Sequence, residues 1–540
     1  MSHRYLCCLL TALTLQAQVF QQARGGRGGT APAPPPPATD CAASGTVVNA
    51  ITGEPIARAM VTMAGVPGNG SATDATGRWN ISNIICGMRN LMATRAGYLA
   101  GNYRPNGSGA PQVVQLISGT PLRDLKIALT PEATISGRVQ DQSGDPIEGA
   151  QIRVMRVMVQ NGKRALSNAQ AGNSDSQGNF RIGQLGAGRY LICANSPQVT
   201  YPVGGGSPWV YEESCFPGPA SAGLSIAMPL EGGREIRTAL TMRAVQGVHV
   251  RGTVAGFATA QLTRVQLMKM PNGSGPGFPG AQVGDDGTFD IPSVPPGSYM
   301  VRVNTQSVVQ QAGRGGGMPL VAQTPVEVGN TDVNGVNLTF QPPGSLSGIV
   351  RYQFSGTATP QVNVSMIPTP ASLPVGPMQW DPSHLNFTFP EVSVGEYRFN
   401  AGSGNPATYI KSAMLRGQNI LNQVFTVSGT TGPVEIVVSD DTGGIDGAIS
   451  DADGHPAPGW VILISATGQT TNIRSGDDGH VGRKNLPSGE YKAWAFDDIT
   501  NVPWAEEEWM TRNAGRATKV TITTGGSASL TLKRVVIPPE

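Results

Sequence analysis

The stretch from Ile135 to Ser196 decides the fold. It reads ISGRVQDQSGDPIEGAQIRVMR at residues 135–156 and NSDSQGNFRIGQLGAGRYLICANS at residues 173–196. Its alternating apolar residues predict short strands, because successive side chains of a strand point to opposite faces. Gly144-Asp145-Pro146 and the glycines at 178, 186 and 188 predict reversals between these strands, since Gly permits positive φ and Pro fixes its own φ.

Two landmarks of this stretch recur along the whole chain. The first is a strand with a central glycine, found at positions 45, 137, 252, 348 and 447. The second is a turn that ends in glycine at positions 87, 188, 297, 395 and 489, and in four copies a Tyr follows two residues later. The second landmark trails the first by 42 to 51 residues each time. Two landmarks that keep step in this way indicate an internal repeat.

The repeats predict five domains of roughly 100 residues, a size at which each can bury its own core. Their predicted bounds are 41–132, 133–246, 247–343, 344–442 and 443–540. The fourth is degenerate, because Pro382-Ser383-His384-Leu385 replaces its Gly turn and predicts an altered hairpin. Many short alternating strands predict an all-β fold, a tandem array of about five antiparallel β-sandwiches. A short helix is expected at 505–513, where acidic residues open its first turn.

The order of these motifs carries a family resemblance. The succession G-x-V, G-x-P, alternating strand, D-x-x-G-x-F/W and L-P-x-G-x-Y resembles carboxypeptidase regulatory-like domains. It is best matched at 41–100, 133–196, 247–304 and 443–496. The resemblance implies a transthyretin-like, carbohydrate-binding-like β-sandwich in each repeat, and the whole arrangement looks like a multi-repeat exported protein of soil-type bacteria. These turn motifs identify a fold rather than a function.

The N-terminus predicts export. Arg4 precedes a short apolar core at 6–15, and Ala17 suits a cleavage site, so residues 1–23 are interpreted as a signal peptide. The alternative is a buried N-terminal strand. Residues 24–40, RGGRGGTAPAPPPPATD, are interpreted as a disordered Gly/Pro linker. No apolar run reaches the roughly 18 residues of a membrane helix. We expect the periplasm, the cell surface or the extracellular space.

Cysteine usage agrees with export. Without Cys7 and Cys8 of the predicted signal, the chain retains Cys41, Cys86, Cys193 and Cys215. An even number in an exported chain predicts two disulfides. The expected pairs are Cys41–Cys86 and Cys193–Cys215, each within one repeat. Zinc binding is the less favoured interpretation, because no C-x-x-C spacing occurs and no His lies nearby in the sequence.

The sequence contains neither the zinc-peptidase nor the serine-hydrolase motif. None of the five histidines begins an H-x-x-E or H-E-x-x-H motif, and no G-x-S-x-G occurs. We therefore expect no catalytic, cofactor-binding or metal-ligating residues, and no enzyme activity. A formal net charge of +2 with 14% charged residues gives no electrostatic case for nucleic acid.

Aromatic residues offer the remaining functional lead, because sugars stack on Trp and Tyr while polar neighbours bind their hydroxyls. The candidates fall in two groups, one in the insertion of the second repeat and one near the C-terminus: Trp209, Tyr211 and Phe216; Trp504 and Trp509. The alternative for the second group is that both tryptophans fix the short helix.

The predicted function is non-catalytic binding at the cell envelope, with polysaccharide as the leading ligand and an envelope protein as the other partner considered. The alternatives are a structural stalk or protein-interaction scaffold, and an accessory to an outer-membrane receptor. The sequence leaves the oligomeric state open.

Overall fold

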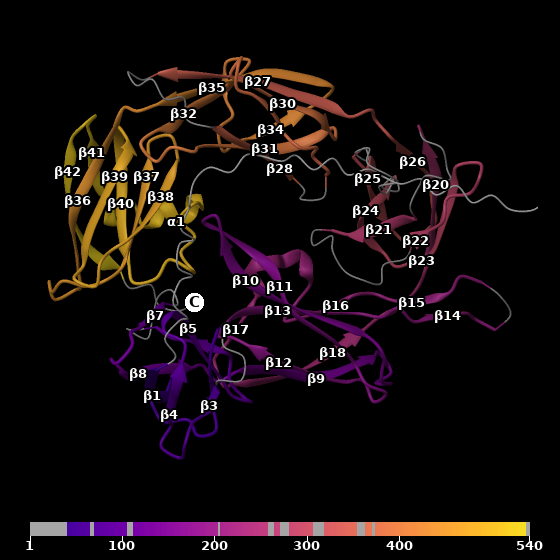
Figure 1. Cartoon of the computed structure of the whole chain (residues 1–540). Helices are drawn as coiled ribbons and strands as arrows, with labels where there is room; N and C mark the ends of the chain where they lie inside the picture. Colours follow the sequence, from indigo (N-terminus) through magenta and orange to yellow (C-terminus); the bar gives the residue numbers. More distant parts are fainter. Residues whose placement is uncertain are drawn as a thin grey trace, which may run out of the picture.

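The computed structural model describes residues 40–64, 70–104, 112–203, 206–256, 264–270, 280–305, 318–353, 362–369 and 373–535. These residues form five consecutive β-sandwiches, here called modules 1 to 5 (Figure 1). Only one to four residues separate the last strand of one module from the first strand of the next.

The strands of modules 1 and 2 surround the predicted landmarks. Module 1 contains β1 (Cys41–Asn49), β2 (Met60–Met63), β3 (Gly70–Ala72), β4 (Arg78–Ile84), β5 (Gly87–Thr94), β6 (Gly101–Asn102), β7 (Val113–Leu116) and β8 (Leu122–Leu129). Module 2 contains β9 (Ala133–Asp141), β10 (Gln151–Gln160), β11 (Lys163–Asn173), β12 (Asn179–Leu185), β13 (Gly188–Asn195), β14 (Val199–Thr200), β15 (Trp209–Tyr211), β16 (Ser214–Phe216), the 3₁₀-helix Ala220–Ile226, β17 (Met228–Leu230), β18 (Glu235–Met242) and β19 (Ala244–Gln246).

Modules 3 to 5 follow the same order. Module 3 contains β20 (Val248–Ala255), β21 (Val265–Lys269), β22 (Gly280–Ala281), β23 (Thr288–Val294), β24 (Gly297–Asn304), β25 (Val321–Val328) and β26 (Val333–Thr339). Module 4 contains β27 (Gly344–Gln353), β28 (Val362–Thr369), β29 (Gln379–Asp381), β30 (Asn386–Val392), β31 (Gly395–Ser403), β32 (Tyr409–Leu415), β33 (Gln418–Asn419), β34 (Val424–Val427) and β35 (Thr430–Ser439). Module 5 contains β36 (Thr442–Ser450), β37 (Trp460–Ser465), β38 (Thr470–Arg474), β39 (His480–Pro487), β40 (Gly489–Phe496), α1 (Glu507–Arg512), the 3₁₀-helix Ala514–Arg516, β41 (Thr518–Ile522) and β42 (Ser527–Val535).

All modules share one sheet plan. The first strand (β1, β9, β20, β27 or β36) lies between an antiparallel neighbour and the last strand of the module, which runs parallel to it. A second antiparallel sheet is built on the pairs β2–β5, β10–β13, β21–β24, β28–β31 and β37–β40. Apolar side chains from the two sheets meet between them and form a separate core in each module. The predicted fold class is confirmed.

The glycine of the first landmark is required by this parallel pair. A Cβ atom at Gly137 would lie 1.9 Å from the carbonyl oxygen of Thr238 on β18. The equivalent distance in module 5 is 1.7 Å, from Gly447 to Leu530. No rotamer change relieves a collision with backbone, so only glycine permits this close approach. Packing geometry therefore explains why the same position is glycine in every repeat.

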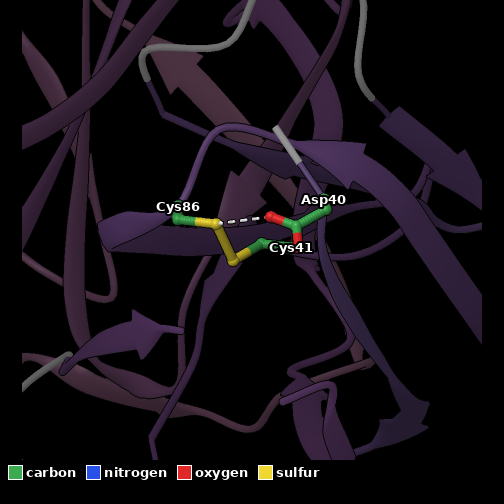
Figure 2. A group of neighbouring side chains, drawn as sticks. All are labelled: Asp40, Cys41 and Cys86. Atoms are coloured by element: carbon green, nitrogen blue, oxygen red, sulfur yellow. Dashed lines mark hydrogen bonds between the residues drawn. A yellow bond between two sulfur atoms is a disulfide. The ribbon is translucent and has the colours of Figure 1, made fainter. Parts of the chain in front are cut away.

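The tyrosine of the second landmark closes its own turn. In modules 2 to 5 its buried hydroxyl donates to the carbonyl oxygen four residues earlier: Tyr190 to Gly186 (2.7 Å), Tyr299 to Pro295 (2.9 Å), Tyr397 to Ser393 (2.7 Å) and Tyr491 to Pro487 (2.8 Å). Module 1 has Arg89 at this position, and there the Cys41–Cys86 disulfide ties β1 to the same turn (Figure 2). Both predicted disulfides are present, the second joining Cys193 on β13 to Cys215 on β16.

Module 4 departs from the plan where the sequence predicts it. In the other modules the third strand pairs with the second, as β11 does with β10. In module 4 the strand β29 pairs instead with β30 across the turn at Pro382–Leu385, and so joins the opposite sheet. The altered hairpin is confirmed.

Module 5 carries an insertion between β40 and β41. The helix α1 within it is shorter than the predicted range 505–513. The insertion covers the outer face of β37 and β40, where Trp494, Phe496 and Trp509 form a small second core. Trp504 packs against this core from the edge.

The array bends back on itself, so that module 5 contacts module 2 (Figure 1). The contact, here called the latch, lies at the tip of the β10–β11 hairpin. The Ala505 N–H donates to the carbonyl oxygen of Gly162 at 2.8 Å. The guanidinium of Arg164 binds the carboxylate of Glu506 with Nη2–Oε2 2.7 Å, and the Arg164 N–H donates to the same carboxylate at 2.7 Å. Trp504 covers Gly162, where a Cβ atom would lie 2.5 Å from the indole nitrogen.

Candidate functional site between modules 2 and 3

A cleft of about 330 Å³ lies between modules 2 and 3. Module 2 provides one wall, from the N-terminal part of β10, the segment after β13, and β15. Module 3 provides the other wall, from β21, β22 and the β23–β24 turn. The cleft is lined by Gln151, Arg153, Asn195, Ser196, Pro197, Gln198, Val199, Tyr201, Val210, Tyr211, Glu213, Arg264, Lys269, Gly280, Pro292, Ser293, Pro295 and Tyr299. Its volume is within the range of small-molecule sites, which occur preferentially at domain interfaces.

A charge cluster of Arg153, Glu213 and Lys269 joins the two walls. Nη2 of Arg153 lies 2.8 Å from Oε1 of Glu213, and Nζ of Lys269 lies 3.4 Å from Oε2. The amide of Asn195 donates to Oε1 at 3.2 Å. Because Lys269 belongs to module 3 and the other groups to module 2, this cluster fixes the modules against each other.

Two tyrosines of the cleft stay protonated in neutral solution. Burial raises the pKa of Tyr299, and the carboxylates of Glu213 and Glu212 raise it further. Burial also raises the pKa of Tyr211, with smaller contributions from Asp141 and Asp145. Both rings therefore present neutral surface to a ligand, while Tyr201 on the rim is exposed to solvent.

The aromatic residues singled out from the sequence are dispersed. Tyr211 lines the cleft, and Phe216 packs against the core of module 2. Trp209 is 43% exposed and does not line the cleft. Trp509 is only 8% exposed and belongs to the second core of module 5. Trp504 packs against that core and covers Gly162 in the latch, which favours the alternative that this pair fixes the helix.

Sequence reasoning missed Tyr201, Arg153, Glu213 and Lys269. Tyr201 lies in the same insertion as Trp209, so the aromatic residues of that insertion were a signal that could have indicated it. The charged residues gave no signal, because Arg153 and Glu213 lie 60 residues apart in the sequence and Lys269 belongs to another module.

Two possible cation clusters contain the disulfides. In the first, Asp40 lies 3.6 Å from the Sγ atom of Cys86 (Figure 2). In the second, Glu213 lies beside Cys193 and Cys215. Metal sites use thiolates, and these sulfurs are bonded to each other, so neither group offers a thiolate ligand. The third cluster, Asp451 with Asp453 and His455, is an exposed turn in which Asp451 accepts the N–H groups of the other two residues.

Fold and cleft together define a multi-module β-sandwich protein with a site between two of its modules. Residues 134–200, which lie within module 2, match the family model of the carboxypeptidase regulatory-like domain. The resemblance read from the sequence motifs is confirmed for this module. No curated protein sequence matches the chain.

The solved structures that match the chain include a minor pilin, a collagen-binding protein and a pilus protein. The minor pilin of Streptococcus agalactiae is 14% identical over 38% of this chain and 96% of its own length, with a TM-score of 0.19. Two B repeat units of the collagen-binding protein of Staphylococcus aureus are 12% identical, covering 74% of this chain and 99% of theirs, with a TM-score of 0.15. The RrgB pilus protein of Streptococcus pneumoniae is 9% identical, covering 76% and 99%, with a TM-score of 0.17.

The helices within the described ranges are all too short to cross a membrane.

Proposed function

We propose that this chain is an exported, non-catalytic binding protein of the cell envelope that holds a polysaccharide in the cleft between modules 2 and 3. The observation that carries the proposal is the composition of the cleft. Tyr201 and Tyr211 supply aromatic surface, while Gln151, Asn195 and Gln198 supply amide groups for hydroxyls. Aromatic faces with a few placed polar groups are the usual means of holding a sugar ring.

The polar groups of the cleft are held in place before any ligand arrives. The Gln198 amide donates to the carbonyl oxygen of Glu148 at 2.7 Å, and Asn195 is bound to Glu213. A site whose donors are already ordered loses less conformational entropy on binding. The two disulfides support export, because such bonds persist in oxidising compartments.

The test is retention on insoluble polysaccharides followed by a glycan array, using the whole chain. We expect saturable binding that falls at least about fivefold in Tyr211→Ala and in Tyr201→Ala, since each removes a stacking ring worth about 1 kcal/mol or more. Trp209→Ala is the matched control, because this residue lies on the same strand as Tyr211 but outside the cleft.

Each outcome of this test either locates the glycan site or contradicts the proposal. Loss of binding in Trp209→Ala alone would place the glycan at Trp209, outside the cleft. Absence of binding to every glycan by folded protein would overturn the proposal.

A rigid protein-interaction scaffold is the second candidate, favoured by the tight joints between modules. Asp441, in the link between modules 4 and 5, accepts the hydroxyl of Tyr409 at 2.7 Å and that of Ser488 at 3.4 Å. Lys411 also binds Asp441, at 3.2 Å. A joint held by several groups orients neighbouring modules. Crosslinking in intact cells would test this candidate, with recovery of one reproducible envelope protein expected and random crosslinks contradicting it.

A further inference from the structure

The charge cluster in the cleft contains more positive than negative charge. Glu213 is the only carboxylate among its three members, and its side chain is 6% exposed. Two cationic side chains converge on it, Arg153 at 12% exposed and Lys269 at 21% exposed. One positive charge in this half-buried group is therefore not balanced within the cluster.

The rest of the cleft adds to this excess of positive charge. Arg264 lines the module 3 wall, where its guanidinium donates to the carbonyl oxygen of Gly280, and no further acidic side chain lines the cleft among the described residues. The neighbouring Glu212 is paired with Arg243 at 3.7 Å. Asp141 and Asp145 act on Tyr211 from the turn after β9, outside the cleft lining.

The segments of modules 2 and 3 outside the described residues contain no acidic residue that could balance the cations of the cleft. Residues 204–205, 257–263, 271–279 and 306–317 contain no Asp or Glu. Charged groups that are partly removed from water are costly unless an opposite charge accompanies them. A ligand that supplies a negative charge would gain from the excess of cations over Glu213.

We infer that the ligand of this cleft is an acidic glycan, whose sugar ring lies against Tyr201 and Tyr211 and whose carboxylate binds Lys269 and Arg264. This inference rests on the proposed function. Lys269 suits the role because its contact with Glu213 is long, at 3.4 Å, and an ammonium group has three donors to distribute. Arg153 is held more tightly by Glu213 and orients that carboxylate.

The experiment is direct binding of paired oligosaccharides to the whole chain. Each acidic oligosaccharide, beginning with oligogalacturonate, is compared with the same molecule after its carboxylates have been reduced to alcohols. We expect the acidic member of a pair to bind roughly tenfold more tightly or better, and to lose affinity as salt rises. Sulfated oligosaccharides in a third arm separate carboxylate recognition from general anion binding.

Variants locate the charge effect. Lys269→Gln and Arg264→Gln are each expected to reduce the preference for the acidic member, measured as the ratio of the affinities for the two members of a pair. Arg237→Gln removes an equal charge from an exposed position of module 2, 84% exposed, and is expected to change neither affinity.

The outcomes are distinguishable from those of the proposed function. Equal binding of both members of every pair would overturn the inference and leave glycan binding intact. A preference retained in both variants, or sulfated sugars bound as well as carboxylated ones, would also overturn it. Absence of binding to all pairs would overturn the inference and the proposed function together.

Discussion

At the scale of single residues, the fold of each repeat depends on contacts that the addition or removal of one heavy atom would break. Gly137 lies where β9 passes β18, and the carbonyl oxygen of Thr238 occupies the space that a Cβ atom would need. Tyr190 lies at the end of the next turn and holds it closed through one hydrogen bond. Both contacts are local to module 2, so their loss should be measurable there without disturbing the other modules.

Gly137→Ala should destabilise module 2 by about 3 kcal/mol, because overpacking against backbone cannot be relieved by a rotamer change. Gly183→Ala is the control in the same sheet, since its Cβ would have its nearest neighbour at an ordinary 3.5 Å. Hydrogen exchange of peptides from β9 and β12 would report the stability of this module alone. Equal protection in the two variants would contradict the packing explanation.

Tyr190→Phe should cost about 1 kcal/mol, the usual net value of a buried hydrogen bond, because the Gly186 carbonyl loses its donor. Tyr201→Phe, at an exposed position on the rim of the cleft, should leave stability unchanged. Thermal unfolding, together with hydrogen exchange in β13, would distinguish the effects of the two variants on stability. A larger loss in Tyr201→Phe would show that the rim, not the turn, stabilises the module.

The positions of these features were predictable, because the sequence shows where the glycines and tyrosines recur. Turn chemistry explains the tyrosine, whose partner lies four residues away, whereas the cause of Gly137 lies on β18 and is seen only in the structure. The cleft residues were not predictable in this way. Glu213 and Lys269 belong to different modules, and no periodicity indicates that they meet at 3.4 Å.

At the scale of elements, the aspartate turns of modules 1 to 3 give their hairpins an acid-sensitive part. Oδ1 of Asp175 accepts the N–H groups of Gln177 at 2.9 Å and Asn179 at 2.8 Å. The hydrogen bond from Asn179, assisted by that from Gln177, lowers the pKa of Asp175 below its ordinary 3.8 against an opposing effect of burial. Similar bonds lower the pKa of Asp74 in module 1 and of Asp286 in module 3.

Stability should therefore fall in acid and not in mild base. The lowered pKa means that the unfolded chain takes up the proton at a higher pH than the folded one. The contribution is complete above about pH 4, the unfolded value, and is lost as the pH falls through the lowered folded pKa. Asp175→Asn keeps an acceptor oxygen but cannot titrate, so its melting temperature should depend less on pH below about 4. An unchanged acid dependence in this variant would assign the effect to other groups.

The elements also show which features sequence patterns predict and which they do not. The short helix was predicted from its acidic first turn, and α1 forms there between Glu507 and Arg512. An aromatic residue looks the same in sequence whether it packs or binds. Trp504 and Trp509 became interpretable only once the insertion was seen to cover the face of β37 and β40.

At the scale of the whole molecule, the latch joins module 5 to module 2, far from it in the chain. Repeats predict a tandem array but contain no information on the angles between modules, which depend on contacts such as that of Arg164 with Glu506. Burial alone would raise the pKa of Glu506, but its bonds to Arg164 outweigh this and lower it. The latch is thus an ionised pair, partly shielded from solvent, at 25% and 21% exposure of the two side chains.

Arg164→Ala or Glu506→Ala should open the arc. A partly exposed bidentate pair with a backbone bond is worth about 1–2 kcal/mol, and its loss leaves the hydrogen bond from Ala505 to Gly162 and the packing of Trp504 on Gly162. Small-angle scattering should show a larger radius of gyration in either variant and in the double variant alike. Arg512→Ala, which breaks the exposed pair with Glu508 inside α1, is the control and should keep the wild-type radius. Unchanged scattering in all variants would show that the joints alone set the curvature.

The parallel pairing of first and last strands has a mechanical consequence. In module 2, β9 and β18 run side by side over eight residue pairs, from Thr134 with Glu235 to Asp141 with Met242. Tension along the chain pulls these strands in opposite directions along their length, so their hydrogen bonds share the force instead of breaking one after another. The latch would yield first, because it has only an ion pair and a few bonds. The molecule would then lengthen by uncoiling its arc, and return when released, before any module unfolds.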